Sequence, residues 1–170
     1  RGPATGYDRA LFAWNSVDVD RNGCDQRNDT MRRDLVETVV APGSNGCRVE
    51  SGVLNDRYTQ TAIRLPRERI EIDHVVSLSN AWQHGAAGWS REQRLRFAHD
   101  PLNLIATTGE LNQRKGAGDA ATWLPPASTY RCDYVARQAT VKQRYGLSVT
   151  DAERTAMERV LAACPGQTLP

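Results

Sequence analysis

Three short segments of the chain combine side chains that can move a proton and bind a cation. Asp73 and His74 are adjacent in a segment rich in β-branched residues, Asn103 lies in a second apolar segment, and Asn112 precedes Lys115 by one helical turn. Neighbouring residues of a strand project to opposite sides, so Asp73 and His74 would have different tasks. Histidine suits proton transfer near neutral pH, and Mg²⁺ accepts carboxylate and amide oxygens while keeping several waters.

This combination suits hydrolysis of a phosphodiester bond, which needs a base for the attacking water and a cation for the phosphate charge. We expect His74 to activate water, and Asp73 and Asn112 to bind Mg²⁺ or Mn²⁺. Lys115, with the neighbouring arginine, would hold the phosphate or the leaving group. Asn103 would orient His74 through its backbone or its side chain. An Asp-His pair alone is more often structural, so the prediction depends on the ordered set.

Each of these residues also has a structural interpretation. Asn103 could cap a turn, and Lys115 could be a solvated helix residue. Glu71 shares a strand face with Asp73 and could be a supporting acid, but it stays outside the predicted set. His84 and His99 lack an aspartate neighbour and are interpreted as ordinary surface or core histidines.

The central segment is predicted to place these residues on a strand, an inserted helix, a second strand and a helix. The first strand spans Ile70 to Leu78. Ser90 and Gln93 form a capping-box pattern for a helix that reaches about His99. A strand from Leu102 to Thr107 and a helix from Glu110 to Lys115 follow.

The flanking segments are predicted to form helices and one hairpin. The expected elements are a short helix with Tyr7, Leu11 and Trp14 on one face, a helix with Met31, Leu35 and Val39 that ends before Pro42, β segments from Cys47 to Leu65 around a turn at Asn55-Asp56, a helix from about Tyr134 to Tyr145, and a helix capped by Thr150 and Glu153 that reaches Cys164.

Length and composition favour a single soluble α+β domain over residues 1–170. The 170 residues can bury one core, and 39% hydrophobic with 25% charged residues is ordinary for a globular protein. The net charge of +2 excludes a strong global field for nucleic acid, although arginines cluster locally. No apolar run approaches the roughly 20 residues that a membrane helix needs, so we expect no membrane partner and a monomer.

Four cysteines indicate disulfides and an oxidising compartment. The sequence has no CxxC spacing, which argues against a zinc knuckle. Among the three connectivities we favour Cys24 with Cys47 and Cys132 with Cys164, because each pair would close a local unit. A chain that starts without Met is typical of a mature secreted form, so we expect secretion.

The ordered set resembles the HNH nuclease motif in its His-Asn-Asn variant. The segments IDHVVSLSNAWQHGA, DPLNLIAT and LNQRKG, with DVDRNGCDQRND and WLPPASTYRCDYV at the flanks, are similar to secreted actinobacterial HNH endonucleases over most of the chain. This resemblance implies a ββα-metal core over about Ile70 to Asp119, with His74 as general base, Asp73 and Asn112 as metal ligands, and Asn103 as the residue that stabilises the loop. Ser77 stands where many relatives have proline, which bears on the loop, and Asn112 in place of histidine argues against a tight zinc site.

Two other classes of function remain open from the sequence. The chain could be a non-catalytic extracellular module that binds nucleic acid. It could also be a calcium-binding module, because Asp18, Asp20, Asn22 and Asp29 match the spacing of a calcium loop. Asp29 is a shorter last ligand than the usual glutamate, and Asp25 occupies a position that is normally apolar. We therefore predict a secreted, Mg²⁺-dependent or Mn²⁺-dependent endonuclease that acts on nucleic acid, with DNA as the expected substrate.

Overall fold

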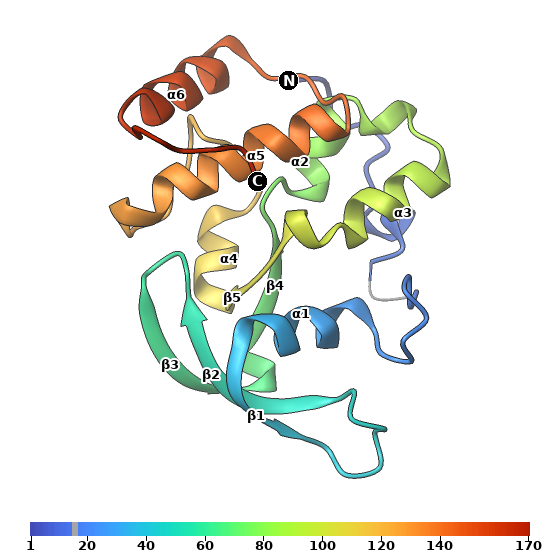
Figure 1. Cartoon of the computed structure of the whole chain (residues 1–170). Helices are drawn as coiled ribbons and strands as arrows, with labels where there is room; N and C mark the ends of the chain where they lie inside the picture. Colours follow the sequence, from blue (N-terminus) through green and yellow to red (C-terminus); the bar gives the residue numbers. More distant parts are fainter. Residues whose placement is uncertain (15–16) are drawn as a thin grey trace.

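The structure, a computed structural model, describes residues 1–14 and 17–170 and has the α+β architecture that the sequence predicts (Figure 1). The helices are α1 (Gln26–Asp34), α2 (Leu78–Gln83), α3 (Arg91–His99), α4 (Gly109–Lys115), α5 (Arg131–Arg144) and α6 (Asp151–Ala162), and the strands are β1 (Leu35–Val40), β2 (Val49–Asp56), β3 (Thr61–Pro66), β4 (Ile70–His74) and β5 (Leu104–Thr108). In this part of the chain no helix is both long and apolar enough to cross a membrane.

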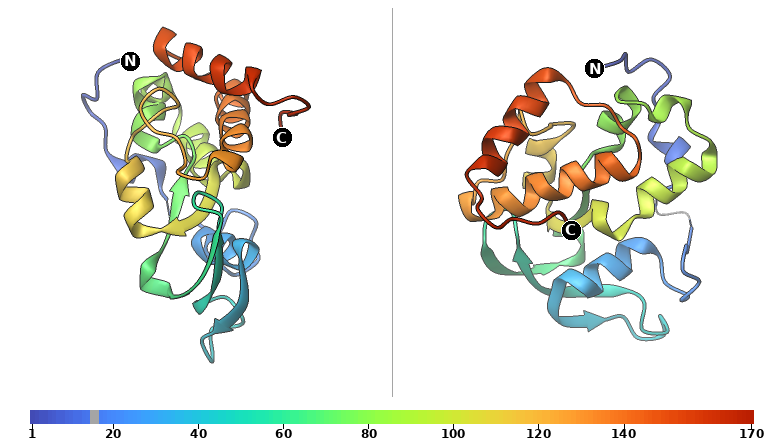
Figure 2. Two further views of the ribbon diagram at one scale, coloured as in Figure 1. Left: turned by 90° about the vertical axis from the view of Figure 1, so that its left-hand side faces the viewer. Right: turned by 45° about the horizontal axis from the view of Figure 1, so that its top comes forward.

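Two small antiparallel sheets form the β part of the molecule. One has the order β1-β2-β3, and the other pairs β4 with β5. The second sheet lies at the centre, between the three-stranded sheet with α1 on one side and α2, α3, α5 and α6 on the other (Figure 1). Figure 2 shows the same layering from two further directions. Helix α4 follows β5 directly and packs against both central strands.

The central sheet is buried on both faces, which explains the apolar residues that both strands carry among their polar ones. Leu104 and Ala106 of β5 pack with Ile70 of β4 in the core beneath the three-stranded sheet. Ile105, which projects to the opposite face, packs with Tyr134 of α5 in a second core. The end of β4 is therefore held from two sides.

Both predicted disulfides are confirmed. Cys24 pairs with Cys47, which ties the loop before α1 to the β1–β2 connection. Cys132 pairs with Cys164, which ties the start of α5 to the residues just after α6. Each bond closes a local unit, as the pairing argument assumed.

The predicted second helix was wrong beyond Asp34. Helix α1 ends there, and the residues from Leu35 to Val40 form β1 instead. This segment is rich in β-branched residues, which favour strands, and it finds a partner in β2, where Val36 lies opposite Val53. The helix begins at Gln26 with Asp25 as its N-cap, so Asp29, the last ligand position of the calcium-loop spacing, lies in α1.

Two further elements are shorter than predicted. The N-terminal helix is a single 3-10 turn, η1 (Arg9–Phe12), that ends where Ala13 adopts a left-handed conformation with φ of 51°. The strand expected to reach Leu78 stops at His74, because the chain then turns and the Ser77 hydroxyl caps α2. The predicted helices α3, α4, α5 and α6 are confirmed, with shifts of a few residues at their ends. The β2–β3 hairpin is also confirmed, but the turn predicted at Asn55-Asp56 was wrong: both residues are paired in β2, and the turn lies at residues 57–60.

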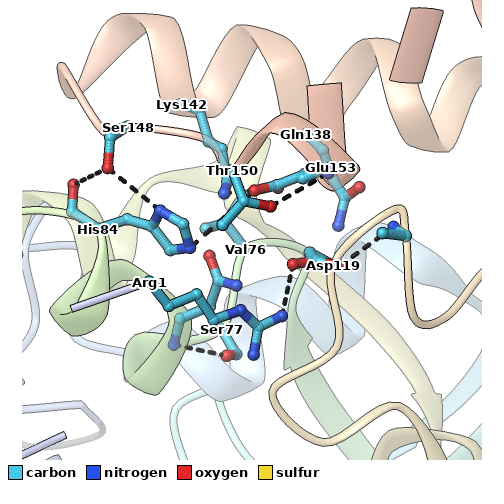
Figure 3. A network of polar contacts seen from close by, with 12 residues as sticks. Arg1, Val76, Ser77, His84, Asp119, Gln138, Lys142, Ser148, Thr150 and Glu153 are labelled. Atoms are coloured by element: carbon cyan, nitrogen blue, oxygen red, sulfur yellow. Dashed lines mark hydrogen bonds and ion pairs between the residues drawn. The ribbon is translucent and has the colours of Figure 1, made fainter. Parts of the chain in front are cut away.

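A buried polar network joins α2, α5 and α6 (Figure 3). Lys142 of α5 and Glu153 of α6 form an ion pair of 2.5 Å, and both side chains are almost completely buried. His84, which follows α2, contacts the Ser148 hydroxyl through Nδ1 at 3.2 Å. Burial, with the Lys142 charge as the next cause, lowers the pKa of His84 to about 4, so this ring is neutral at neutral pH.

Candidate active site

Asp73 and His74 end β4, and the structure surrounds the Asp73 carboxylate with two donors. The Tyr58 hydroxyl donates to Oδ2 at 2.5 Å, and the Lys115 ammonium donates to Oδ1 at 2.9 Å. Burial raises the pKa of the Asp73 carboxyl, while the Lys115 charge and the Tyr58 hydrogen bond act in the opposite direction. Burial also raises the pKa of Tyr58 well above its usual value, so its hydroxyl keeps the proton that it donates.

Lys115 was predicted to hold the phosphate or the leaving group, but its side chain does not reach the surface. Its side chain is fully buried, and Nζ donates to both Asp73 and the backbone carbonyl of His74, the latter at 2.8 Å. The last turn of α4 thus fastens the end of β4. In this position Lys115 compensates the buried carboxylate, and its ammonium does not face solvent.

His74 is held by one ring nitrogen. Nε2 lies 2.9 Å from the carbonyl oxygen of Ala98, and a carbonyl can only accept, so Nε2 carries the proton. In the neutral ring Nδ1 is then the nitrogen with a lone pair. The Trp14 ring packs edge-on against the imidazole with 4.8 Å between centroids. Burial lowers the pKa of His74 to about 3, which keeps the ring neutral in the free protein.

Asn103 acts on the loop that follows His74. Its side chain is fully buried, Oδ1 accepts the Val76 N–H at 2.8 Å, and Nδ2 donates to the Val76 carbonyl at 3.2 Å. The backbone carbonyl of Asn103 also accepts the Val75 N–H at 2.8 Å. Asn103 therefore holds the chain directly after His74 through the backbone rather than by touching the imidazole.

Asn112 is oriented by Glu71, a residue that the predicted set left out. Nδ2 of Asn112 donates to Oε2 of Glu71 at 2.7 Å, so the amide oxygen Oδ1 is the end that remains for another partner. Gly109 makes room for this acid, because a Cβ at that position would lie 3.0 Å from Oε1 of Glu71. Glu71 had a sequence signal, since it shares a strand face with Asp73.

Two cavities meet at these residues. The first, of about 240 Å³, is lined by Asp73, His74 and Asn112. The second, of about 250 Å³, is lined by Trp14, Arg27 and Glu71 and also reaches Asn112. Arg9, Ile72 and Asn112 line both, so the cavities adjoin along β4.

The predicted residues divide into two groups in space. Asp73, His74 and Asn112 line the first cavity, whereas Lys115 and Asn103 lie behind it and fix the backbone. Sequence reasoning missed Tyr58 and Arg9. Tyr58 lies in the turn after β2 and Arg9 in η1, and neither segment carries a pattern that links it to β4.

The segment from Asp18 to Asp29, which has the spacing of a calcium loop, is closed by its own hydrogen bonds. Asp18 accepts from the backbone of Asn22 and Gly23, and the Asn22 amide donates to Asp20 and Asp29 at 3.0 and 3.1 Å. Within residues 1–14 and 17–170, no group of three or more His, Cys, Asp or Glu side chains is placed to hold a metal ion. The calcium alternative gains no support from this arrangement.

Comparison with known proteins gives a family for the chain. Residues 25–160 match the family described as GmrSD restriction endonucleases, C-terminal domain. An "Uncharacterized secreted protein" of Arthroderma benhamiae is 38% identical over 167 residues, which is 96% of this chain and 78% of that protein. No solved structure matches the chain.

The relative and the two disulfides assign the protein to the secreted class. The family match covers β4, β5 and α4 together with the α1 and α5 segments around them, and so includes every residue of the predicted site. The chain therefore belongs to the family of GmrSD restriction endonuclease C-terminal domains.

Proposed function

We propose that this protein is a secreted, divalent-metal-dependent endonuclease of the HNH type that hydrolyses DNA, with β4, β5 and α4 as its ββα-metal core. One observation carries the proposal. The Ala98 carbonyl holds the proton on Nε2 of His74, so the lone pair of Nδ1 belongs to a ring that lines the same cavity as Asp73 and Asn112. A base and two oxygen ligands thus meet in one place.

His74 would take the proton from the attacking water at Nδ1. The Ala98 carbonyl then stabilises the imidazolium, since it accepts from the opposite nitrogen throughout. The free protein keeps the ring neutral, as a base requires. The negative charge of a bound phosphodiester would raise the pKa of the ring and strengthen it as a base.

Asp73 and Asn112 fit a hard cation such as Mg²⁺ or Mn²⁺. The fit depends on the amide orientation: Glu71 accepts from Nδ2 of Asn112, and the oxygen remains for a metal. Such an ion would neutralise charge on the scissile phosphate and on the leaving oxygen. Lys115 supports the site from behind by holding the Asp73 carboxylate and the His74 carbonyl in place.

DNA is the substrate that the family description favours, because restriction endonucleases act on DNA. The chain has two lysines, Lys115 and Lys142, and each forms a buried ion pair. Exposed positive charge for the phosphates is thus supplied by arginine side chains, which bind phosphate bidentately.

The test is incubation of the purified protein with supercoiled plasmid, single-stranded DNA and RNA across Mg²⁺, Mn²⁺, Ca²⁺ and Zn²⁺. We expect nicking and linearisation of the plasmid with Mg²⁺ or Mn²⁺ and none after exhaustive EDTA treatment. Cleavage that survives EDTA would contradict the metal role. Binding of DNA without cleavage under any metal would instead support a non-catalytic module.

A further inference from the structure

Lys115 is buried behind Asp73, so a different cationic side chain has to contact the substrate phosphate. Of the Lys and Arg side chains in the described part of the chain, two arginines line the adjoining cavities. Arg27 lines only the second, and its guanidinium donates to the backbone carbonyls of Arg67 and Ile70 at 3.1 and 2.8 Å. Arg9 lines both cavities. It is thus at their junction.

The N-terminal segment is anchored so that Arg9 has a defined position. The Asp8 carboxylate caps η1 by accepting the Ala10 N–H at 2.8 Å. Phe12 is fully buried and packs against Phe97 of α3 and Trp82 of α2, with ring centroids 6.2 and 6.4 Å apart. The segment, blue in Figure 1, runs beside these two helices. Because Phe12 fixes one side of η1 in the core, the exposed Arg9 lies on the other side of this turn.

Arg9 is exposed, and it lines the first cavity together with Asp73 and His74. Within residues 1–14 and 17–170, none of the ion pairs with a carboxylate includes Arg9. A cation with this position and no carboxylate partner is suited to an anionic ligand.

We propose that Arg9 binds a phosphate of the substrate strand at the junction of the two cavities, so that the strand passes along β4 from the first cavity into the second. This inference rests on the proposed function and adds to it the route of the nucleic acid. Each cavity then takes the nucleotide on one side of the contacted phosphate. The N-terminal segment, remote in sequence from the core, becomes part of the substrate-binding surface.

The test measures binding without metal, so that cleavage is not needed. A fluorescein-labelled DNA duplex is titrated in EDTA over a series of salt concentrations, with anisotropy as the readout. The variants are Arg9→Gln, Arg9→Lys and the control Arg154→Gln on α6, a helix that lines neither cavity. Near-ultraviolet circular dichroism confirms that each variant is folded.

We expect Arg9→Gln to weaken binding about tenfold and to reduce the slope of log K against log salt by about 0.9, the value for one lost duplex phosphate contact. Arg9→Lys should restore the slope, and Arg154→Gln should match the wild type. With metal, Arg9→Gln should lower kcat/KM by a similar factor.

An unchanged affinity and salt slope in Arg9→Gln would overturn the inference even if the wild type cleaves DNA. Loss of thermal stability without a change in binding would show a structural role for Arg9 and also overturn it. Binding by the wild type without cleavage would refute the proposed function alone, and the Arg9 slope would still decide the inference. Absence of DNA binding by the wild type would refute both.

Discussion

Replacing Asn103 with alanine should lower both the free energy of unfolding and the rate of plasmid cleavage. The substitution removes both side-chain partners of Val76, whose backbone N–H and carbonyl lie in a fully buried environment. Leaving a buried polar group without a partner costs roughly 1–3 kcal/mol. The substitution leaves two such groups without partners, and the loop can recover part of the lost free energy by shifting. We therefore expect the free energy of unfolding to fall by about 2–4 kcal/mol.

That loss corresponds to a decrease of roughly 5–15 °C in Tm for a domain of this size. It should be measured by urea unfolding followed by tryptophan fluorescence. The exposed Asn55 provides a matched control as Asn55→Ala, which should change the free energy of unfolding by less than about 0.5 kcal/mol.

The same variant separates positioning from mere stability. At a temperature where the wild type and Asn103→Ala are both folded, the variant should cleave plasmid more slowly than the wild type. The remaining unfolded fraction would be too small to account for this decrease, which arises because the backbone after His74 has lost its two hydrogen bonds to Asn103. If the free energy of unfolding of Asn103→Ala were within about 0.5 kcal/mol of that of the Asn55→Ala control, the stabilising role of the Asn103 side chain would be refuted. Full activity in a destabilised but folded variant would refute its link to His74.

Three further outcomes follow from particular contacts. Glu71→Gln should weaken Mn²⁺ binding by about tenfold in calorimetry, because the amide of Asn112 loses its fixed orientation; equal affinity would exclude that role. Lys115→Met should lower stability by about 3–5 kcal/mol in urea unfolding, because it leaves the buried Asp73 carboxylate without its cation; a neutral result would show that this pair is not needed. His84 has a folded pKa of about 4, below the 6.5 of the unfolded chain, so its contribution is present above pH 6.5 and is lost as the pH falls towards 4. Between pH 7 and 5 the stability advantage of the wild type over His84→Gln should shrink by about 2 kcal/mol, and a constant difference would contradict the depressed pKa.

Local signals in the sequence were reliable where the neighbouring residues alone determine the structure. The Ser90 and Gln93 capping box begins α3 as predicted, with both reciprocal hydrogen bonds formed. The cysteine pairs were also predictable, because each closes a short unit. The same holds for the presence of Asp73 and His74 in a strand, since β-branched residues and alternation are local features, although the strand ends at His74 and not at Leu78 as predicted.

Features that depend on distant partners were not predictable. The residues after Asp34 follow a helical spacing of apolar side chains, but pairing with β2 turns them into β1, so tertiary contacts overrode the local period. Tyr58 donates to Asp73, and Arg9 lines the same cavity as Asp73 and His74, although both come from other segments of the chain. No local pattern connects them to β4, and only the fold brings them to the site.

The central claim is that His74 is the base of a metal-dependent nuclease, and His74→Ala tests it most directly. The measurement is the initial rate of plasmid nicking with Mg²⁺ or Mn²⁺, on protein whose circular dichroism matches that of the wild type. A general base contributes roughly 10²–10⁴ to the rate. We predict a folded variant whose rate falls within that range below the wild type, and a folded variant that nicks plasmid at the wild-type rate would contradict the account.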